Sequence, residues 1–146
     1  MIEKRGNLWE LAKGNILCIT TNGFVKKNGE CVMGKGIAYE ATKRFPELPK
    51  ILGKKISTNG NNVHTLGIFG DYILLSFPVK PIISFTAQPV KHMIGKINPQ
   101  EGIPGWACVA DPTIIEKSTK ELALLCNNLP TQVFLPRPGC GAGELT

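Results

Sequence analysis

The pattern of apolar and polar positions switches along the chain between runs typical of buried strands and spacings typical of amphipathic helices. Apolar runs at 16–21, 72–77 and 132–135, with a shorter one at 63–66, predict strands. Helical spacing starting at Gly36 is stopped by Pro46, and a second helical stretch begins at the pair Asp111 and Pro112, a capping carboxylate followed by proline. Strands that alternate with helices indicate an α/β fold.

Three further stretches refine this picture. Residues 2–5 predict a short strand, after which Leu8 and Trp9 turn inward. Residues 81–109 are rich in Pro and Gly and have no clear period, which indicates a lid or binding loop that Trp106 anchors against the body. The second helical stretch is expected to bury one face, formed by Ile114, Ile115, Ser118, Leu122 and Leu125.

Two glycine-rich loops follow predicted strands. Residues 33–38 carry Gly34 and Gly36 and open the first helix, and the chain after 135 breaks into Pro and then into three glycines. Glycine permits positive φ and close approach, so the backbone N–H groups of such loops can turn toward an anion such as a pyrophosphate. Neither loop has the phosphate-loop motif or the three-glycine dinucleotide fingerprint. One such loop is also typical of a plain surface turn, but two at one sheet edge can flank one ligand.

Length and composition narrow the class of protein. With 146 residues and 42% hydrophobic content, the chain is expected to form one domain without disulfides. Five cysteines without a Cys-x-x-Cys pair and two isolated histidines favour a reducing compartment and no structural zinc. Since a secretion signal and an apolar run of roughly 18 residues are both lacking, we expect a soluble, cytoplasmic protein with no membrane partner. The net charge of +6 suits a polyanionic partner, although cations spread along the chain are also typical of plain solubility.

Together the motifs resemble those of the macro domain family, whose members bind ADP-ribose. The matching pieces, in family order, are residues 5–9, 19–23, 33–38, 76–80 and 135–141. The pattern is most similar to the branch that contains terminal ADP-ribose glycohydrolase and bacterial DNA de-ADP-ribosylating antitoxins. This resemblance implies that residues 1–146 form a single macro domain, a three-layer α/β/α sandwich with a mixed central sheet. The family continues with a Trp-containing helix and a final strand, whereas this chain stops at Thr146, so either the chain is shortened or a partner molecule closes the loop.

The resemblance also implies where ADP-ribose lies. Its pyrophosphate is expected across 139–143, its adenine near Asn7, where the family usually has Asp, and its distal ribose at Asn22. The residues expected to bind the ligand are Asn7, Leu8, Asn22, Met33, Gly34, Lys35, Gly36, Ile37, Ala38, Arg137, Pro138, Gly139, Cys140, Gly141, Ala142, Gly143, Glu144 and Leu145.

Several of these residues have plainer alternatives. Asn7 is also a residue that caps turns. Asn22 with Gly23 is a signature of hairpin turns, although the residues that follow do not make a pairing strand. Lys35 is equally well explained as a solvated surface lysine.

Lys80 follows the strand that Pro78 ends, where this branch of the family carries a lysine implicated in catalysis. On its own, a lysine after a strand is typical of an exposed surface, but ligands bind at the carboxyl ends of strands in α/β sheets. The glycohydrolase relative has an Asp where this chain has Gly143, and the antitoxins have glycine there; Glu144 either substitutes for the missing carboxylate or points elsewhere. Lys91 is the next candidate if its loop closes as a lid.

Three functions remain open at this stage. The first is a hydrolase that removes ADP-ribose from DNA or protein, or phosphate from ADP-ribose 1''-phosphate. The second is a module that sequesters ADP-ribose or a related nucleotide signal without turnover, and the third is nucleic-acid binding without ADP-ribose. Lys80 favours the first, the missing loop carboxylate favours the second, and the third explains neither glycine loop. No metal and no cofactor are expected; the expected partner is ADP-ribose or an ADP-ribosylated substrate, including modified nucleic acid.

Overall fold

A mixed four-stranded sheet forms the middle layer of the structure, a computed structural model that describes residues 2–145. The strand order is β2-β3-β1-β6, with β1 parallel to both β3 and β6 and β2 antiparallel to β3. The strands are β1 (Ile16–Thr21), β2 (His64–Phe69), β3 (Tyr72–Pro78) and β6 (Val133–Phe134). The apolar runs of β1 and β3 make the two central strands, which are buried on both faces, as predicted for such runs.

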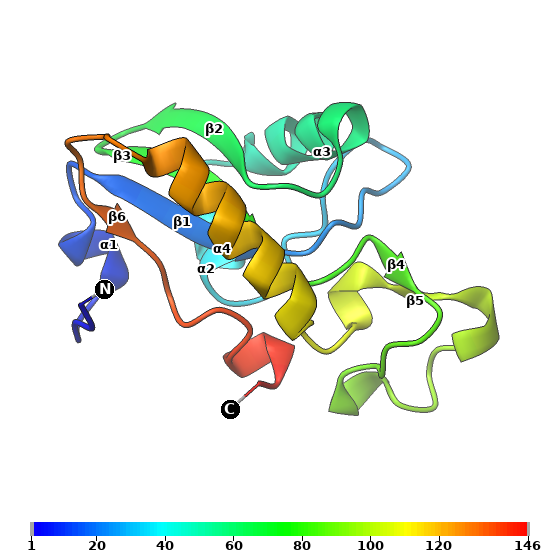
Figure 1. Cartoon of the computed structure of the whole chain (residues 1–146). Helices are drawn as coiled ribbons and strands as arrows, with labels where there is room; N and C mark the ends of the chain where they lie inside the picture. Colours follow the sequence, from blue (N-terminus) through cyan, green and yellow to red (C-terminus); the bar gives the residue numbers. More distant parts are fainter. Residues whose placement is uncertain (1, 146) are drawn as a thin grey trace.

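One face of the sheet is covered by three helices (Figure 1). They are α1 (Leu8–Leu11), α2 (Ile37–Arg44) and α3 (Leu48–Asn59). Alternate β1 residues Leu17 and Ile19 point to this side and pack with Leu52 of α3 and Trp9 of α1. The Trp9 ring meets the Tyr72 ring edge to face at 5.1 Å between centroids, so the inward turn predicted for Trp9 is confirmed.

The opposite face of the sheet is covered by α4 (Pro112–Cys126). The other β1 residues, Ile16 and Cys18, pack on this side with apolar residues of β3 and α4. Ser118 is buried under the helix and its hydroxyl donates to the Pro78 carbonyl at 2.7 Å. The prediction for Leu125 is wrong: its side chain is 45% exposed, and Cys126 packs on the sheet instead. At 3.6 residues per turn, Cys126 lies closer than Leu125 to the helix face formed by Ile115 and Leu122, which packs on the sheet.

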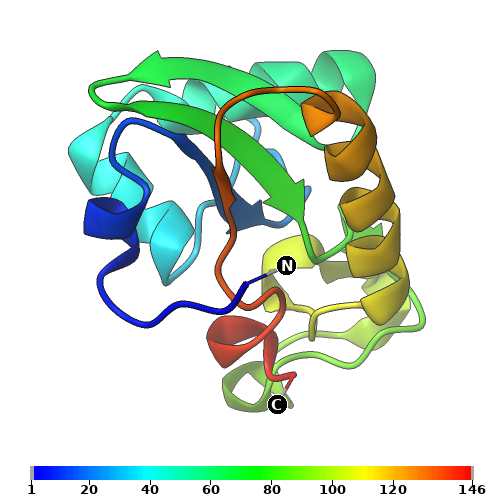
Figure 2. The same cartoon turned by 60° about the vertical axis from the view of Figure 1, so that its left-hand side comes forward.

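Two other elements differ from expectation. α3 was not predicted, although Leu48, Leu52 and Ile56 recur at helical spacing and are all buried. Residues 2–5 form no strand. They lie beside β6 near the sheet edge (Figure 2), where the Lys4 ammonium lies 5.9 Å from the centre of the Phe134 ring. A side-chain contact of this kind needs no backbone ladder, so the segment stays irregular.

The long segment 81–109 is built from short pieces. They are β4 (Ile83–Ser84), β5 (Ile103–Pro104), and the 3-10 turns η1 (Lys91–Met93), η2 (Pro99–Glu101) and η3 (Gly105–Ala107). The segment projects to one side of the sheet in Figure 1 and has a small core of its own, formed by Ile103, Ala107 and Cys108. Trp106 packs against this small core, which corrects the expectation that its ring anchors the segment to the body.

The direction of the strands decides where the expected site lies. Since β1, β3 and β6 are parallel, their carboxyl ends meet at one edge of the sheet. The first glycine loop follows β1, Lys80 follows β3, and the second glycine loop follows β6. The prediction that both loops lie at the same edge is therefore confirmed. Within the described chain, no helix has the length and apolar character needed to cross a membrane.

Candidate functional site

Lys80 is buried at this edge, with only 8% of its surface exposed. Its ammonium Nζ donates to the Trp106 carbonyl at 3.4 Å, and its own carbonyl accepts from the Asn61 side-chain amide at 2.9 Å. Burial lowers the pKa of Lys80 below its ordinary value, and the nearby Cys108 and Glu144 partly oppose this. The structure thus contradicts the surface-lysine alternative, and burial favours the neutral amine, the form that can act as a base or nucleophile.

Asn22, at the end of β1, is buried and holds the first glycine loop in place. Its Nδ2 donates to the Val32 carbonyl at 2.8 Å, and its Oδ1 accepts from the Phe24 backbone N–H at 2.8 Å. Asn22 and Gly23 form no hairpin turn of β1, because β1 pairs in parallel with β3 and β6 and not with the residues that follow it. A Cβ on Gly23 would lie 2.6 Å from Asn61 Cγ and 2.7 Å from Ile82 Cγ1. The contact of Asn22 with the ribose stays a prediction, and the structure shows that the same side chain also shapes the loop.

The first glycine loop leads into α2. Gly36, with φ of +73°, is the N-cap residue of α2 and provides no side chain to cap the first turn. Uncapped N–H groups at a helix start favour an anion. Ala38 is buried, Met33 and Ile37 are partly buried against the core, and Lys35 is exposed. The loop therefore presents backbone and one lysine, as the phosphate-binding expectation requires.

The second glycine loop ends in the 3-10 turn η4 (Gly141–Gly143). The turn is closed by the Glu144 N–H to the Gly141 carbonyl and by the Leu145 N–H to the Gly139 carbonyl, both at 2.9 Å. Gly141 has φ of +70° and open space where a Cβ would stand. Its backbone is consequently open to a close approach by a ligand, and glycine avoids the strain of this conformation.

Gly143 is glycine for a different reason. A Cβ there would lie 2.7 Å from the Ala110 Cβ, and the Gly143 carbonyl accepts from the Ala110 N–H at 2.9 Å. The loop is pressed against the strand-like stretch before α4, so an Asp at this position would require the backbone to move. The carboxylate of the glycohydrolase relative is excluded here by packing.

Glu144, the next residue, has the left-handed conformation with φ of +61°. Its Oε2 accepts from the backbone N–H of Lys91 at 2.9 Å, across 53 residues of sequence. Its charge raises the pKa of Lys80 against the effect of burial. The carboxylate is thus directed to the Lys91 N–H and acts on Lys80 through its charge; that it substitutes for the missing carboxylate stays a prediction.

The remaining expected ligand residues lie at the start of α1 and in the second loop. Asn7 caps α1, because its Oδ1 accepts from the N–H groups of Trp9 and Glu10 at 2.9 and 3.4 Å. Acceptance from an adenine amino group would compete with these bonds. Leu8 is partly buried against the core. Arg137 is exposed and pairs with Glu3, Pro138 and Cys140 are partly buried, and the side chain of Ala142 lies outside the described part of the structure.

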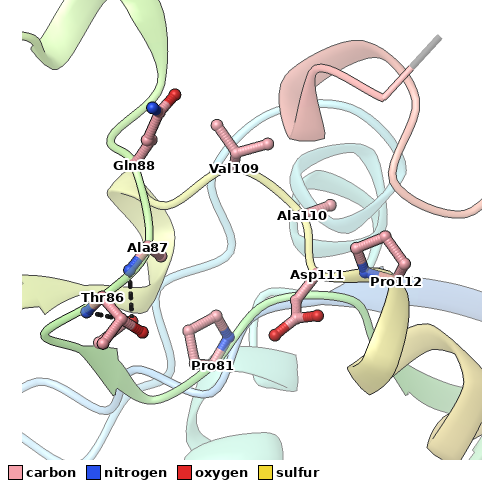
Figure 3. A pocket seen from close by; sticks show the side chains of 9 residues that line it. Pro81, Thr86, Ala87, Gln88, Val109, Ala110, Asp111 and Pro112 are labelled. Atoms are coloured by element: carbon pink, nitrogen blue, oxygen red, sulfur yellow. Dashed lines mark hydrogen bonds between the residues drawn. The ribbon is translucent and has the colours of Figure 1, made fainter.

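A pocket of about 340 Å³ begins at Pro81, directly after Lys80, and lies between the start of segment 81–109 and the turn into α4 (Figure 3). Its lining contains none of the expected ligand residues and consists of Pro81, Ser84, Thr86, Ala87, Gln88, Val109, Ala110, Asp111 and Pro112. Asp111 uses Oδ1 to cap α4 through the Thr113 N–H at 2.8 Å. The motifs did not point to this pocket, because its walls come from the segment that lacks a period.

The other reactive side chains of the described residues are the cysteines and the possible metal ligands. Among residues 2–145, no group of three or more His, Cys, Asp or Glu is placed to hold a metal ion. The five cysteines are all free thiols. Burial raises the pKa of Cys18 and of Cys31 to about 12, so both stay protonated at neutral pH. Lys80 is therefore the candidate nucleophile or base at this edge.

Comparisons with known proteins give one informative result. No protein-family model matches the chain, and no curated protein matches it. Among solved structures, the macrodomain of Mycobacterium tuberculosis DarG is similar, with 21% identity, a TM-score of 0.65, and coverage of 98% of this chain and 79% of that one. The sheet order, the helices on both faces and this neighbour agree with the resemblance of the loops: the chain has the macrodomain fold.

Proposed function

We propose that residues 1–146 act as one macro domain that binds ADP-ribose between the two glycine loops and hydrolyses an ADP-ribosyl linkage with Lys80. The observation that carries this proposal is the burial of Lys80 at the carboxyl end of β3, the neighbour of β1, at the sheet edge from which both loops start. Burial lowers its pKa, which increases the fraction of neutral amine available for catalysis. The free thiols and the lack of a membrane-spanning helix among the described residues are compatible with a cytoplasmic site of action.

The chemistry follows from the bond to be broken. Cleavage at the anomeric carbon develops positive charge on the ribose, while the pyrophosphate must be held still. The backbone N–H groups of the loops at Gly36 and Gly141 hold the pyrophosphate. Lys80, as the neutral amine, takes a proton from water while the water oxygen bonds to the anomeric carbon and the ADP-ribosyl link breaks. Alternatively, its nitrogen adds to C1 of the opened sugar as the C=O π bond breaks, and water hydrolyses the resulting imine.

Three substrates in parallel test this function: ADP-ribosylated DNA, ADP-ribosylated protein and ADP-ribose 1''-phosphate. We expect turnover of at least one of them, with Lys80→Ala lowering kcat at least about 100-fold while the Kd for free ADP-ribose changes by no more than a few fold. Gly141→Val is the matched control for binding, because a branched side chain in the open space of the loop should abolish ADP-ribose binding in calorimetry. An active Lys80→Ala protein would exclude the proposed mechanism.

The second candidate is a module that binds ADP-ribose, or a related nucleotide, without turnover. The packing of Gly143 against Ala110 favours it, because the loop cannot carry a catalytic carboxylate at that position. Binding of ADP-ribose by a wild-type protein that is inactive on all three substrates would establish this alternative.

A further inference from the structure

Hydrogen bonds join segment 81–109 to the rest of the molecule. At its two ends, the Gly23 N–H donates to the Pro81 carbonyl at 3.3 Å and the Asp111 N–H to the Val79 carbonyl at 2.9 Å. Between these ends the segment packs on its own small core, separate from the two larger clusters that hold the sheet. A hydrogen bond between the middle of the segment and the second glycine loop therefore contributes to holding the segment against that loop.

Glu144 provides such a hydrogen bond. Its Oε2 accepts from the Lys91 N–H at 2.9 Å, in the 3-10 turn at the middle of the segment. The backbone of Glu144 is left-handed, with φ of +61°, a conformation that is strained for a residue with a Cβ. A glycine would adopt it without this strain. The strain indicates that the carboxylate at this point in the loop has a use that offsets it.

The same segment also contacts Lys80. The Trp106 carbonyl accepts from Lys80 Nζ at 3.4 Å, and the charge of Cys108, two residues further on, acts on the pKa of the same ammonium. Any change in how the segment lies against the second loop must alter these contacts. Glu144 and Lys80 are thus connected by two routes, through the segment and through the direct attraction of opposite charges.

We propose that Glu144 is a positioning residue: its carboxylate latches segment 81–109 onto the second glycine loop and holds the Lys80 ammonium at the mouth of the site. The catalytic consequence rests on the function proposed above for Lys80, whereas the latch itself does not. The direct route predicts that the charge of Glu144 keeps Lys80 more protonated than burial alone would allow. Among the described residues, Cys108, from the segment, and Glu144, from the loop, are titratable groups whose charges raise the pKa of Lys80.

Two substitutions separate the two routes. Glu144→Gln keeps an oxygen that can accept from the Lys91 N–H but removes the charge, and Glu144→Ala removes both. In ligand-free protein, we expect the Lys91 amide to exchange about tenfold faster in Glu144→Ala than in wild type and to be nearly unchanged in Glu144→Gln. In both variants the pKa of Lys80, measured by NMR titration, should be lower than in wild type. The Lys80 signal is assigned as the one that is missing from the spectrum of Lys80→Arg.

The expected kinetic effect is a shift of the pH profile of kcat and not a loss of activity. In Glu144→Gln the acid limb of kcat should move to lower pH, because less alkaline solution suffices to deprotonate Lys80. The matched control is Glu101→Gln, which removes one exposed carboxylate from the same segment and should change neither the Lys80 pKa nor the exchange of Lys91.

Unchanged exchange at Lys91 in Glu144→Ala would overturn the latch, and an unshifted Lys80 pKa in Glu144→Gln would overturn the electrostatic role. Both measurements are made without substrate. A wild-type protein that turns over none of the substrates would therefore refute the proposed enzyme without affecting this inference. Turnover by a protein in which Glu144 changes neither the Lys91 exchange nor the Lys80 pKa would refute this inference without affecting the enzyme.

Discussion

At the scale of single residues, the environment of Lys80 sets two effects against each other. Burial removes water from the ammonium and favours the neutral amine, while Cys108 and Glu144 favour the charged form. Since burial is the larger effect, the folded protein holds Lys80 in a state that disfavours its charge. Such a site costs stability, and this cost is expected where a side chain is kept for chemistry.

Replacing Lys80 by a neutral side chain of similar length should therefore stabilise the protein. We expect Lys80→Met to raise the free energy of unfolding at pH 7 by on the order of 1 kcal/mol, measured by urea denaturation. The folded-state pKa lies below the ordinary value of 10.5, so the wild type gains stability as pH rises between the two values and the difference from Lys80→Met shrinks there. Lys50→Met, at an exposed position of α3, is the control. A variant less stable than wild type at pH 7 would contradict this account.

Gly143 shows how one small residue can limit chemistry. Its position against Ala110 leaves no room for a side chain, so a carboxylate cannot enter the loop there without moving its backbone. The available carboxylate is displaced by one residue, to Glu144, whose left-handed backbone directs it to the Lys91 N–H. The geometry of one backbone position thus decides where in the second loop a carboxylate can stand.

At the scale of elements, helix starts and strand ends supply the polar groups of the site. α2 begins at Gly36 without a side-chain cap, whereas α4 is capped by Asp111 and α1 by Asn7. A capped helix start has used its N–H groups internally, and an uncapped one keeps them for a ligand. The difference between α2 and α4 favours α2 as the helix that faces the anion.

Asn7 combines a cap with an expected ligand contact, and substitutions can tell the two apart. Asn7→Ala should lower the free energy of unfolding by about 1 kcal/mol, because α1 loses its cap. Asn7→Asp keeps an acceptor for the cap and restores the family's usual residue, so it should leave stability nearly unchanged and bind ADP-ribose at least as tightly as wild type. Calorimetry and thermal unfolding on both variants check this. Binding of ADP-ribose by Asn7→Ala as tight as that of wild type would remove Asn7 from the site.

At the scale of the whole molecule, the parallel strands and segment 81–109 contribute different parts of the site. Parallel pairing of β1 with β3 and β6 gathers three strand ends at one edge. Segment 81–109, with its own small core, stands beside that edge in Figure 1 and contributes the Trp106 carbonyl to Lys80. A rigid sheet next to a more weakly held segment is an arrangement in which binding can change local stability without altering the fold.

Amide hydrogen exchange should show this difference in local stability between the sheet and the segment. Backbone amides in 87–108 should exchange faster than those of β1 and β3, because the small core of the segment buries fewer side chains. If ADP-ribose binds only when the segment is closed, a ligand concentration of 100 times Kd should slow exchange in the segment by roughly 100-fold. The last turn of α4 lies at the other end of the sheet and serves as the control. Exchange in 87–108 that is indifferent to ligand would show that the segment takes no part in binding.

The sequence alone determined the parts that depend on local pattern. Long apolar runs specified β1 and β3, Asp111 with Pro112 specified the start of α4, and glycines after strands located both loops. These signals depend on neighbours in the chain, so distant contacts are not needed to interpret them. The weaker periodicity of α3 was present as well, and Leu48, Leu52 and Ile56 would have revealed it.

Only the tertiary structure decided the parts that depend on residues far apart. The burial of Lys80 results from the return of Trp106 and Cys108 to the end of β3. The contact of Glu144 with Lys91 spans 53 residues, and the exclusion of a side chain at Gly143 depends on Ala110. Desolvation, charge proximity and steric exclusion act through space and not along the chain, and for that reason no spacing in the sequence encodes them.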